Sequence, residues 1–596
     1  MSVLKSYLNM NNIETDVIYW NIIFSELLNE FKSNDINSFE ISRLIPFLGN
    51  IACELNDNIS FDLITNEYST YSPELINISS NVYKDYIYVS IDKLMNIINE
   101  VLSNLQLDNY NLFGISAQFG QWIPGNILIN QVKKVNPKIK FVLGGFGSKK
   151  EALAFMKNFA QYDYAIWGEG EYPLKRLYDY MLGKININEV PNIIYRINNE
   201  LFVSDCSNKV YFNLNDRIPD HSDFFLQYKS DENISITIEG GRGCHWNKCK
   251  FCFVNTGYRF RTKSVETVIA EIRYAINQYN KFDFLFIDND IIGNDYERFN
   301  VLLDNLIEIK KQHEKFRIIG AEVITKKISS RIIKKMSLAG FSNIQIGYEA
   351  LSDQLLDKID KKNSISSNFL FVKWASYYEI LVEGANIIRN LLEETDTDIL
   401  ISDKNLHYLR FFIKRGKFQH FFSTLSINTS SRYYKGIDIK EVYNEWNYNR
   451  LCNLIPQGYF SDIDKYDLFY FKKRYMNPLW DNVVKKESFY LNNDFRYKIF
   501  TDGKKIYYNE YFNDLVTSSL EFLQDDLHWK ILCFCNHEVM SITSILNYLN
   551  TYSEDYIKNI IIELQNEWLM YSKADLSENV TIINTDNIEL MKEIHS

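Results

Sequence analysis

The sequence contains no apolar run of the roughly 20 residues that a helix needs to cross a bilayer, which excludes a transmembrane segment. The first residues, MSVLKSYLNMNN, lack the apolar core and small-residue cleavage site of a secretory signal, so we expect a cytoplasmic protein with no membrane partner. Long runs of Lys or Arg are also missing, and the formal net charge is -11, which argues against nucleic acid as a partner. An apolar fraction of 46% and 596 residues fit an ordinary globular chain of several domains.

Cysteine is scarce, and its few positions are informative. Of eight cysteines, Cys244, Cys249 and Cys252 fall close together, directly after the strand-like segment ISITIEGG. Clustered cysteines in a large cytosolic chain indicate metal or redox chemistry rather than disulfides. A structural zinc site takes four protein ligands, but no second Cys-x-x-Cys pair is nearby, and the adjacent His245 would complete the set only with strained geometry. Three thiolates suit an iron–sulfur cluster with one iron left open, and zinc is the alternative.

After this loop the chain alternates helical and strand patterns, which favours a parallel α/β architecture. Amphipathic helices are expected at 264–279 and 328–340, and strands at 282–290, 317–323, 343–352 and 383–388. Side chains at the carboxyl ends of parallel strands face the active site of a barrel. The expected strand ends carry Asp288, Glu322, Glu349 and Asn386.

The spacing Cys244-x4-Cys249-x2-Cys252, with Phe251 before the last cysteine, resembles the Cys-x3-Cys-x2-Cys loop of radical S-adenosylmethionine (SAM) enzymes, with one extra residue. The order of strands resembles their partial (β/α)6 barrel. FIDND occupies the place of their SAM amine contact, and IGYEALSDQLLDKIDKK resembles their Gly-x-Glu strand. The resemblance implies a [4Fe-4S] cluster on the three cysteines. It also implies SAM contacts from Phe251, Asp288, Glu322, Glu349 and Asn386.

One segment departs from the family pattern. NIIRNLLEETDTD, residues 386–398, resembles a segment of cobalamin-type members, but the Gly-Phe-Pro-Gly portion is replaced by Asn390 through Glu393. Because this portion forms a tight glycine turn near the cofactor, we expect an altered turn there.

The segment 110–182 shows a second α/β pattern, in which glycines follow strands and let a ligand approach the backbone. GISAQF, KIKFVLGG and DYAIWGEGEYPL resemble the cobalamin-binding domain that precedes many radical SAM barrels. The resemblance implies that cobalamin contacts Ser116, Gln118, Gly144, Gly145, Gly168, Glu169 and Gly170. The first histidine of the chain is His221, so a histidine lower ligand from this domain is excluded. The alternative is a domain of this type that binds no cofactor.

The C-terminal part contains the expected hairpin RYKIFTDGKKIYY at 496–508, then three helical patterns beginning with SSLEFLQDDLHWKILCFCN and a terminal strand. This order is typical of a winged helix, and its acidic balance argues against DNA. The overall layout resembles the cobalamin-dependent radical SAM maturases of ribosomally made peptides.

We therefore expect an α/β chain with a Rossmann-like cobalamin-binding-type domain, a central partial barrel, and a C-terminal α+β region ending in a winged-helix-like module. The expected boundaries are 1–35 for an N-terminal extension, 36–205, a linker at 206–230, 231–435, 436–512 and 513–596.

The resemblance implies cleavage of SAM, hydrogen abstraction from an unactivated carbon of a precursor peptide, and C-methylation through cobalamin. Its cofactors would be the cluster, SAM and cobalamin, and its partners the peptide and a one-electron reductant protein. Three alternatives stay open: a peptide maturase with a non-methyl reaction, an enzyme for small molecules, and a peptide-binding protein without catalysis. No catalytic side chain is assigned from the sequence.

Overall fold

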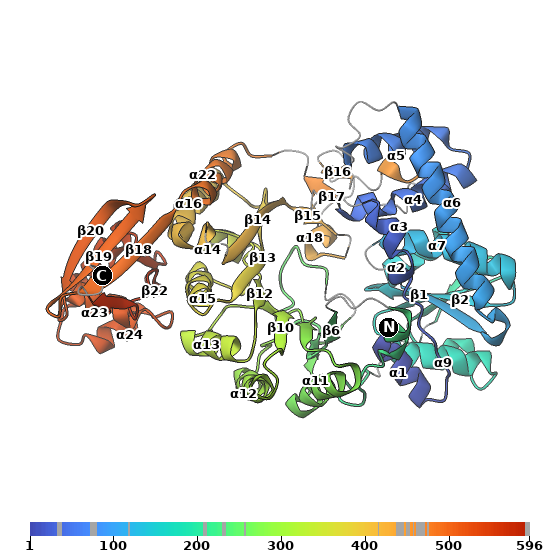
Figure 1. Cartoon of the computed structure of the whole chain (residues 1–596), viewed down its shortest axis with the longest axis horizontal. Coiled ribbons are helices and arrows are strands. Elements are labelled where there is room, and N and C mark those ends of the chain that lie inside the picture. The colour runs from blue at the N-terminus through green and yellow to red at the C-terminus, as the bar shows by residue number, and fades with distance from the viewer. Residues whose placement is uncertain are drawn as a thin grey trace. The chain divides into compact units, whose positions relative to one another are not determined.

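The computed structural model describes residues 1–31, 39–71, 80–116, 120–204, 206, 211–228, 234–254, 258–414, 417–428, 430–436, 446–448, 453–456, 458–459, 471–473 and 476–590 (Figure 1). The chain divides into two compact units. The first comprises residues 1–232, 251–259 and 426–472, and the second comprises residues 233–250, 260–425 and 473–596. None of the described helices combines the length and apolarity that crossing a membrane requires.

The first unit contains a five-stranded sheet of order β1-β2-β3-β4-β5, in which β1 to β3 are parallel and β4 and β5 are antiparallel. These strands are β1 (Leu112–Ser116), β2 (Lys140–Phe146), β3 (Tyr164–Trp167), β4 (Ile193–Ile197) and β5 (Glu200–Val203). Helices α7 (Trp122–Val135) and α8 (Lys149–Asn158) connect the parallel strands, and α9 (Glu171–Met181) follows β3. The sequence predicts this Rossmann-like arrangement, and the structure has it.

Six α-helices among the described residues lie N-terminal to the sheet. They are α1 (Ser2–Met10), α2 (Trp20–Ile23), α3 (Ser25–Asn29), α4 (Phe39–Glu54), α5 (Asn58–Tyr71) and α6 (Ser80–Asn104). Those from α3 to α6 bury residues in the core that they share with the sheet. Phe24, Leu27 and Phe31 are buried in one cluster with α4 and with Phe141 of β2. The last part of the expected N-terminal extension therefore packs into the same core as the sheet. Short elements complete the unit: η2 (Leu107–Asn109), η4 (Ile187–Glu189), α10 (Ser222–Gln227), β15 (Ser426–Ile427), α18 (Arg432–Lys435), β16 (Trp446–Tyr448) and β17 (Phe471–Lys473).

The second unit contains the expected partial barrel. A three-stranded sheet of order β10-β9-β6 and a four-stranded sheet of order β11-β12-β13-β14 are parallel throughout. The strands are β6 (Ser235–Ile238), β9 (Asp283–Phe286), β10 (Arg317–Gly320), β11 (Glu322–Val323), β12 (Asn343–Ile346), β13 (Leu381–Arg389) and β14 (Phe418–Thr424). An isolated parallel bridge between Ile318 and Phe341 continues the pairing from β10 toward β12.

Helices between the strands bury an apolar face against the outside of the barrel. They are α11 (Val265–Tyr279), α12 (Tyr296–Gln312), α13 (Ser330–Leu338), α14 (Asp353–Lys358), α15 (Ile365–Tyr377), α16 (Asp396–Leu406), η5 (His407–Leu409) and α17 (Arg410–Ile413). Side chains that accept a backbone N–H fix several of their first turns, among them Ser264, Ser352 and Thr395. Alternation of strand and helix, read from the sequence, predicts this unit correctly.

The C-terminal part of the second unit has a four-stranded sheet and a winged-helix-like module. Helix α22 (Trp480–Asn492) precedes a sheet of order β20-β19-β18-β23, formed by β18 (Phe495–Thr501), β19 (Lys505–Phe512), β20 (Leu515–Leu523) and β23 (Ile588–Leu590). The hairpin predicted at 496–508 is the antiparallel pair β18 and β19. The module consists of α23 (Leu527–Phe534), α24 (Ile542–Tyr548), α25 (Glu554–Asn566) and the hairpin of β21 (Met570–Ser572) and β22 (Asn579–Thr581).

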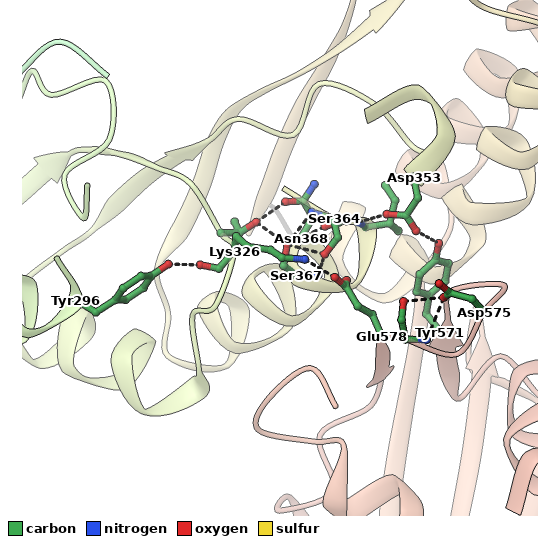
Figure 2. A network of polar contacts seen from close by, with 12 residues as sticks. Tyr296, Lys326, Asp353, Ser364, Ser367, Asn368, Tyr571, Asp575 and Glu578 are labelled. Carbon is green, nitrogen blue, oxygen red and sulfur yellow. Dashed lines mark hydrogen bonds and ion pairs between the residues drawn. The ribbon is translucent and has the colours of Figure 1, made fainter. Parts of the chain in front are cut away.

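Polar contacts join this module to the segments that follow β11 and β12 of the barrel (Figure 2). The hydroxyl of Tyr571 donates to Asp353 Oδ2 at 2.8 Å, and Lys326 forms an ion pair with Glu578. The hydroxyl of Tyr296 donates to the carbonyl of Lys326, so the same segment is also tied to α12. The module therefore has a defined seat on the barrel.

A buried lysine on α15 adds further contacts between the module and the barrel. Lys373 is 2% exposed, and its Nζ donates to the carbonyl and Oδ1 of Asn536, both at 2.8 Å, and to the carbonyl of Thr581 at 2.6 Å. Trp374 Nε1 donates to the same Asn536 carbonyl at 2.8 Å. Burial lowers the pKa of Lys373 to about 7.

Candidate active site

One face of the barrel strands is buried beneath helices, and the other is accessible. Ile238, Phe284 and Ile344 lie on the outer face and are fully buried. Residues alternating with the outer ones point inward and are exposed: Thr237, Ile287, Glu322, Gln345 and Phe421. Because a complete barrel fills its interior with such side chains, an accessible inner face indicates room for ligands. We therefore place the candidate active site at the inner face and carboxyl ends of these strands.

The cysteine loop leaves the barrel through a short two-stranded neck just after β6. Strand β7 (Gly241–Arg242) pairs antiparallel with β8 (Arg261–Thr262), so the cysteine loop begins and ends at the same place. Trp246 Nε1 donates to the carbonyl of Asp360 at 2.6 Å, and the N–H of Lys250 donates to the carbonyl of Ile359 at 3.0 Å. These bonds hold the Cys244–Cys249 part of the loop against the end of α14.

All three cysteines of the motif are half-buried and free of disulfides. Cys244 and Cys249 belong to the second compact unit, whereas Phe251 and Cys252 belong to the first. Within the described ranges, no three His, Cys, Asp or Glu side chains converge on one metal-ion position. A four-iron cluster does not require such convergence, because each of its thiolate ligands bonds a different iron. The donor set, three partly accessible thiols in one loop and none of them in a disulfide, fits a [4Fe-4S] cluster.

His245 is engaged by two other side chains. Its Nε2 lies 2.6 Å from Lys362 Nζ, and its Nδ1 lies 3.2 Å from Asp290 Oδ2, though without hydrogen-bonding geometry. Burial lowers the pKa of Lys362, while the charges of Asp290 and Cys244 oppose this shift. These two contacts link the residue next to Cys244 to Lys362 and Asp290.

Asp288 lies beneath the neck of the cysteine loop. It is 5% exposed, and its Oδ2 accepts the N–H of Gly240 at 2.9 Å. A Cβ on Gly240 would lie 3.0 Å from Asp288 Oδ1, so glycine permits this close approach. Burial raises the pKa of Asp288 to about 8. The contact of Asp288 with SAM stays a prediction, and its role in this structure is to support the glycine turn.

Arg298, on α12, completes the support of this turn. Its Nη2 donates to the carbonyls of Gly240 at 3.1 Å and Lys263 at 2.6 Å, and its Nε donates to Lys263 at 2.9 Å. These bonds tie the start and the end of the neck to one helix. The sequence gives no signal for this role, because an arginine in the first turn of an amphipathic helix is ordinary.

Glu349, just after β12, forms an ion pair with Lys361, a residue that the sequence does not predict for the site. Lys361 Nζ lies 2.9 Å from Glu349 Oε1, and a Cβ on Gly347 would lie 2.2 Å from that nitrogen. Glycine at 347 therefore makes room for the lysine. The backbone of Glu349 has a φ of 59°, a left-handed conformation that is uncommon for glutamate and often marks a functional position.

Glu322 lies in the same electrostatic environment, on β11 beside Gln345 of β12. Solvent reaches its side chain, but the surrounding protein atoms of the inner face partly desolvate the carboxyl group. This desolvation raises the pKa of Glu322. Lys361 opposes the shift, and Glu349 and Asp290 add to it. Four charged groups therefore meet at the ends of β9, β11 and β12, of which Glu322 and Glu349 are predicted SAM contacts.

Asn386 of β13 presents an unsatisfied acceptor. Its Oδ1 is buried and has no hydrogen-bond partner among the described residues, while its backbone carbonyl accepts the N–H of Glu349 at 2.8 Å. A buried amide oxygen without a donor is destabilising, and a ligand that supplies an N–H or O–H removes that cost. The ammonium or ribose hydroxyls of SAM are groups of this kind.

The segment that stands in place of the family's glycine turn has a left-handed backbone at Asn390. Asn390 has a φ of 60°, and asparagine is the residue other than glycine that adopts this conformation most readily. Its Oδ1 accepts the N–H of Asn477 at 2.8 Å, and Glu394 Oε2 accepts the N–H of Asn390 at 3.1 Å. The turn at this position of the chain therefore has a positive φ without a glycine.

Replacing Asn390 by valine is expected to lower the free energy of unfolding by about 2 kcal/mol, because a β-branched residue resists positive φ and cannot bond Asn477. Asn390→Gly keeps the backbone conformation and is expected to cost about half as much. Urea unfolding of both variants measures the difference. Equal stability of the two variants would show that backbone conformation is not what residue 390 contributes.

In the first unit, the residues predicted to bind cobalamin gather at the carboxyl edge of the parallel strands. Ser116 is directly in register with Gly144, and Gly168 donates its N–H to the carbonyl of Phe146 at 2.8 Å. Gly145 and Gly168 have φ values of 97° and 75°. Glu169 is buried, and Gly170 begins α9 as its N-cap. Gln118 lies outside the described residues.

The space above this edge is open. A Cβ on Gly144 would meet no atom within 4 Å. Gly144 of β2, in register with Ser116 of β1, therefore has open space where a side chain would be, and such bare backbone is the feature by which sheets of this kind admit a cofactor. The residues present fit a large planar ligand lying over the strand ends.

Comparison with known proteins supports this assignment of the central part of the chain. Residues 238–401 match the sequence profile of the Radical SAM superfamily. The radical S-adenosylmethionine methyltransferase TsrM from Kitasatospora setae, solved with cobalamin and a [4Fe-4S] cluster bound, is similar at a TM-score of 0.50 and 14% identity, over 70% of this chain and 88% of that chain. At this identity the similarity concerns the fold.

The cobalamin-dependent S-adenosylmethionine radical enzyme OxsB, solved with aqua-cobalamin and S-adenosylmethionine, has a TM-score of 0.49 and 18% identity. That match covers 66% of this chain and 59% of the OxsB chain, so this protein spans less than two thirds of its length. No curated protein matches the sequence significantly.

The match to the family, the parallel partial barrel and the three free thiols in the loop after its first strand agree with one another. Residues 238–401 form a radical SAM domain, a fold that implies a [4Fe-4S] cluster and S-adenosylmethionine.

Proposed function

We propose that this enzyme binds cobalamin in its Rossmann-like domain and methylates an unactivated carbon of a ribosomally made peptide. The observation that carries the proposal is the open edge of the first sheet. Ser116 faces Gly144 there, and bare backbone meets open space at the carboxyl ends of parallel strands. TsrM, which has a similar fold, is a methyltransferase solved with both cobalamin and a [4Fe-4S] cluster.

The barrel residues have separate tasks in this proposal. Cys244, Cys249 and Cys252 would hold the cluster, while Glu349, paired with Lys361, and Asn386 would orient SAM through its hydrogen-bond donors. When bound, the cluster and SAM supply hydrogen abstraction from an unactivated carbon, and cobalamin supplies the methyl group. The chain itself fixes the loop, excludes water and positions the substrate carbon.

Cobalamin would bind in the first unit without a histidine ligand from that domain, because the chain has no histidine before His221. Gly144 and Gly145 would let the corrin ring approach the backbone of β2, and Ser116 supplies a hydroxyl beside it. The N-terminus of α9, with Gly168 to Gly170 before it, closes the same edge.

A peptide substrate is supported by the winged-helix-like module. The module consists of three helices and a hairpin, and Tyr571, Glu578 and Lys373 fix its position on the barrel. Negative charge begins its outer helix, where Ser553 caps α25 and Glu554 and Asp555 follow. We propose a precursor peptide as its ligand and a one-electron reductant protein as the second partner.

The decisive experiment combines protein reconstituted anaerobically with iron and sulfide, SAM, a reductant and a candidate precursor peptide, with and without cobalamin. The expected products are 5′-deoxyadenosine under both conditions and a methylated peptide only when cobalamin is present. Mass spectrometry of peptide and nucleoside measures both. SAM cleavage without peptide methylation in the presence of cobalamin would contradict the proposed reaction but not the radical SAM assignment.

Gly144→Leu tests the cobalamin site. The new side chain enters open space, so the fold is expected to persist while corrin retained after gel filtration falls at least about tenfold, the effect of blocking a preformed pocket by a bulky group. Gly144→Ala adds a single carbon and serves as the matched control, with most binding retained. Unchanged corrin binding by the leucine variant would place cobalamin elsewhere or exclude it.

A further inference from the structure

A cavity of about 560 Å³ lies within the first unit, beside strand β1. All five residues of β1 line one wall, and the segment Asp16–Tyr19 lines another. The remaining walls are mostly apolar, with Phe24 and Leu128 among them. Asp16 and Arg43 are the charged side chains of the lining, and their charges cancel. An occupant of this cavity is therefore expected to be apolar and uncharged.

The wall formed by β1 is an unpaired sheet edge. Strand β1 stands at the end of the order β1-β2-β3-β4-β5 and pairs in register with β2 from Leu112 to Ser116. In the part of the chain that the structure describes, no strand pairs with its other side. An open edge presents a row of N–H and C=O groups that bind another extended chain well.

The segment Asp16–Tyr19, which also lines the cavity, has hydrogen bonds that alternate as in an extended strand. The N–H and C=O of Val17 bond Asp223 Oδ2 at 2.7 Å and Gln227 Nε2 at 2.6 Å, and the N–H of Tyr19 donates to Gln227 Oε1 at 2.9 Å. Successive residues of an extended chain direct their backbone groups to opposite sides. Those of Ile18 therefore point away from α10, and no partner for them is found among the described residues.

We infer that this cavity is a docking slot for an extended, apolar and uncharged peptide segment of about five residues, supplied by another polypeptide, which adds a strand beside β1. The inserted strand accepts and donates hydrogen bonds along β1 on one side and to Ile18 on the other. Its side chains fill the apolar walls. A small apolar molecule does not satisfy these two backbone edges. Apart from Ser116, which lies at the sheet edge where cobalamin is proposed to bind, the residues of this slot take no part in the proposed reaction.

The test uses the full chain and an acetylated, amidated peptide of about seven alternating valine and threonine residues, monitored by hydrogen exchange. Saturable binding is expected, with exchange of the outward-facing amides of β1 and of Ile18 slowed at least about tenfold. The same peptide N-methylated at alternate residues keeps every side chain but loses one hydrogen-bonding edge, and is expected to bind at least about tenfold more weakly. Equal binding of the methylated peptide, or binding without protection of β1, would overturn the inference.

Two variants test the slot from the protein side. Ile18→Pro removes the N–H that faces the cavity, and Leu44→Trp fills the cavity from α4, where Leu44 lines it. Both are expected to weaken peptide binding, and circular dichroism verifies that each variant is folded. Retained affinity in a folded Leu44→Trp variant would also refute the slot, because the peptide would then bind elsewhere.

Discussion

Replacing Cys244 by alanine is expected to reduce formation of 5′-deoxyadenosine to the background of protein without a cluster. The three thiols of the loop are the donors that fit the cluster, and the loop has a fixed place between β7 and β8. Two remaining thiolates leave one iron without its protein ligand, so the cluster is expected to be lost or degraded. Iron and sulfide content, the visible absorption of the reconstituted protein and SAM cleavage measure the effect.

Cys206→Ala is the matched control, because Cys206 is exposed and stands apart from the motif in the sequence. We expect this variant to retain both the cluster and SAM cleavage. Zinc in place of iron in anaerobically purified protein, or full SAM cleavage by the Cys244 variant, would overturn the assignment of these thiols. A folded Cys244 variant is expected, since the neck and the bonds of Trp246 and Lys250 do not involve the sulfur.

The second large effect concerns stability. Lys373→Met is expected to lower the free energy of unfolding by about 2–3 kcal/mol near pH 7, because Asn536 Oδ1 and the carbonyl of Thr581 lose a buried donor. The carbonyl of Asn536 keeps its bond from Trp374 Nε1. Urea unfolding measures the change. Lys334→Met, an exposed lysine on α13, is the control and is expected to change stability by less than about 0.5 kcal/mol.

Lys373 also predicts a pH dependence of definite sign. Burial lowers its pKa to about 7 in the folded protein, whereas the ordinary value is 10.5. Between these values the unfolded chain binds a proton that the folded chain does not, so stability rises with pH across this window and falls as the pH drops toward 7. The difference between the parent protein and Lys373→Met isolates this contribution. A difference that is constant between pH 7 and 10 would contradict it.

The periodic parts of the fold were accessible from the sequence. Helix 264–279 and the strands ending near Asp288, Glu322 and Glu349 follow from apolar spacing, which records what each element buries. The prediction was wrong in SSLEFLQDDLHWKILCFCN. Its first six residues belong to strand β20, and α23 begins only at Leu527, after the cap Asp526. The helix propensity of Leu and Glu in this strand is overridden by pairing with β19.

The site was predictable where a residue type dictates chemistry and not where geometry does. Three clustered thiols indicate a metal or cluster site from the sequence alone. The partners of Glu349 and His245 are Lys361 and Lys362, which in the sequence are only two lysines after a short helix. Asn390 shows a further limit. Loss of the family's glycines predicts an altered turn, while the backbone retains positive φ because asparagine tolerates it.

The fixed position of the C-terminal module on the barrel has a consequence for which residue of a bound peptide would be modified. Tyr571 and Glu578 bind segments that follow two barrel strands, and Lys373 anchors the module on α15. The span between the outer helix α25 and the strand ends is thereby constant. If the module binds the proposed precursor peptide, the modified residue would lie a set number of residues from the bound segment. Residues inserted between the two would then change which position is modified.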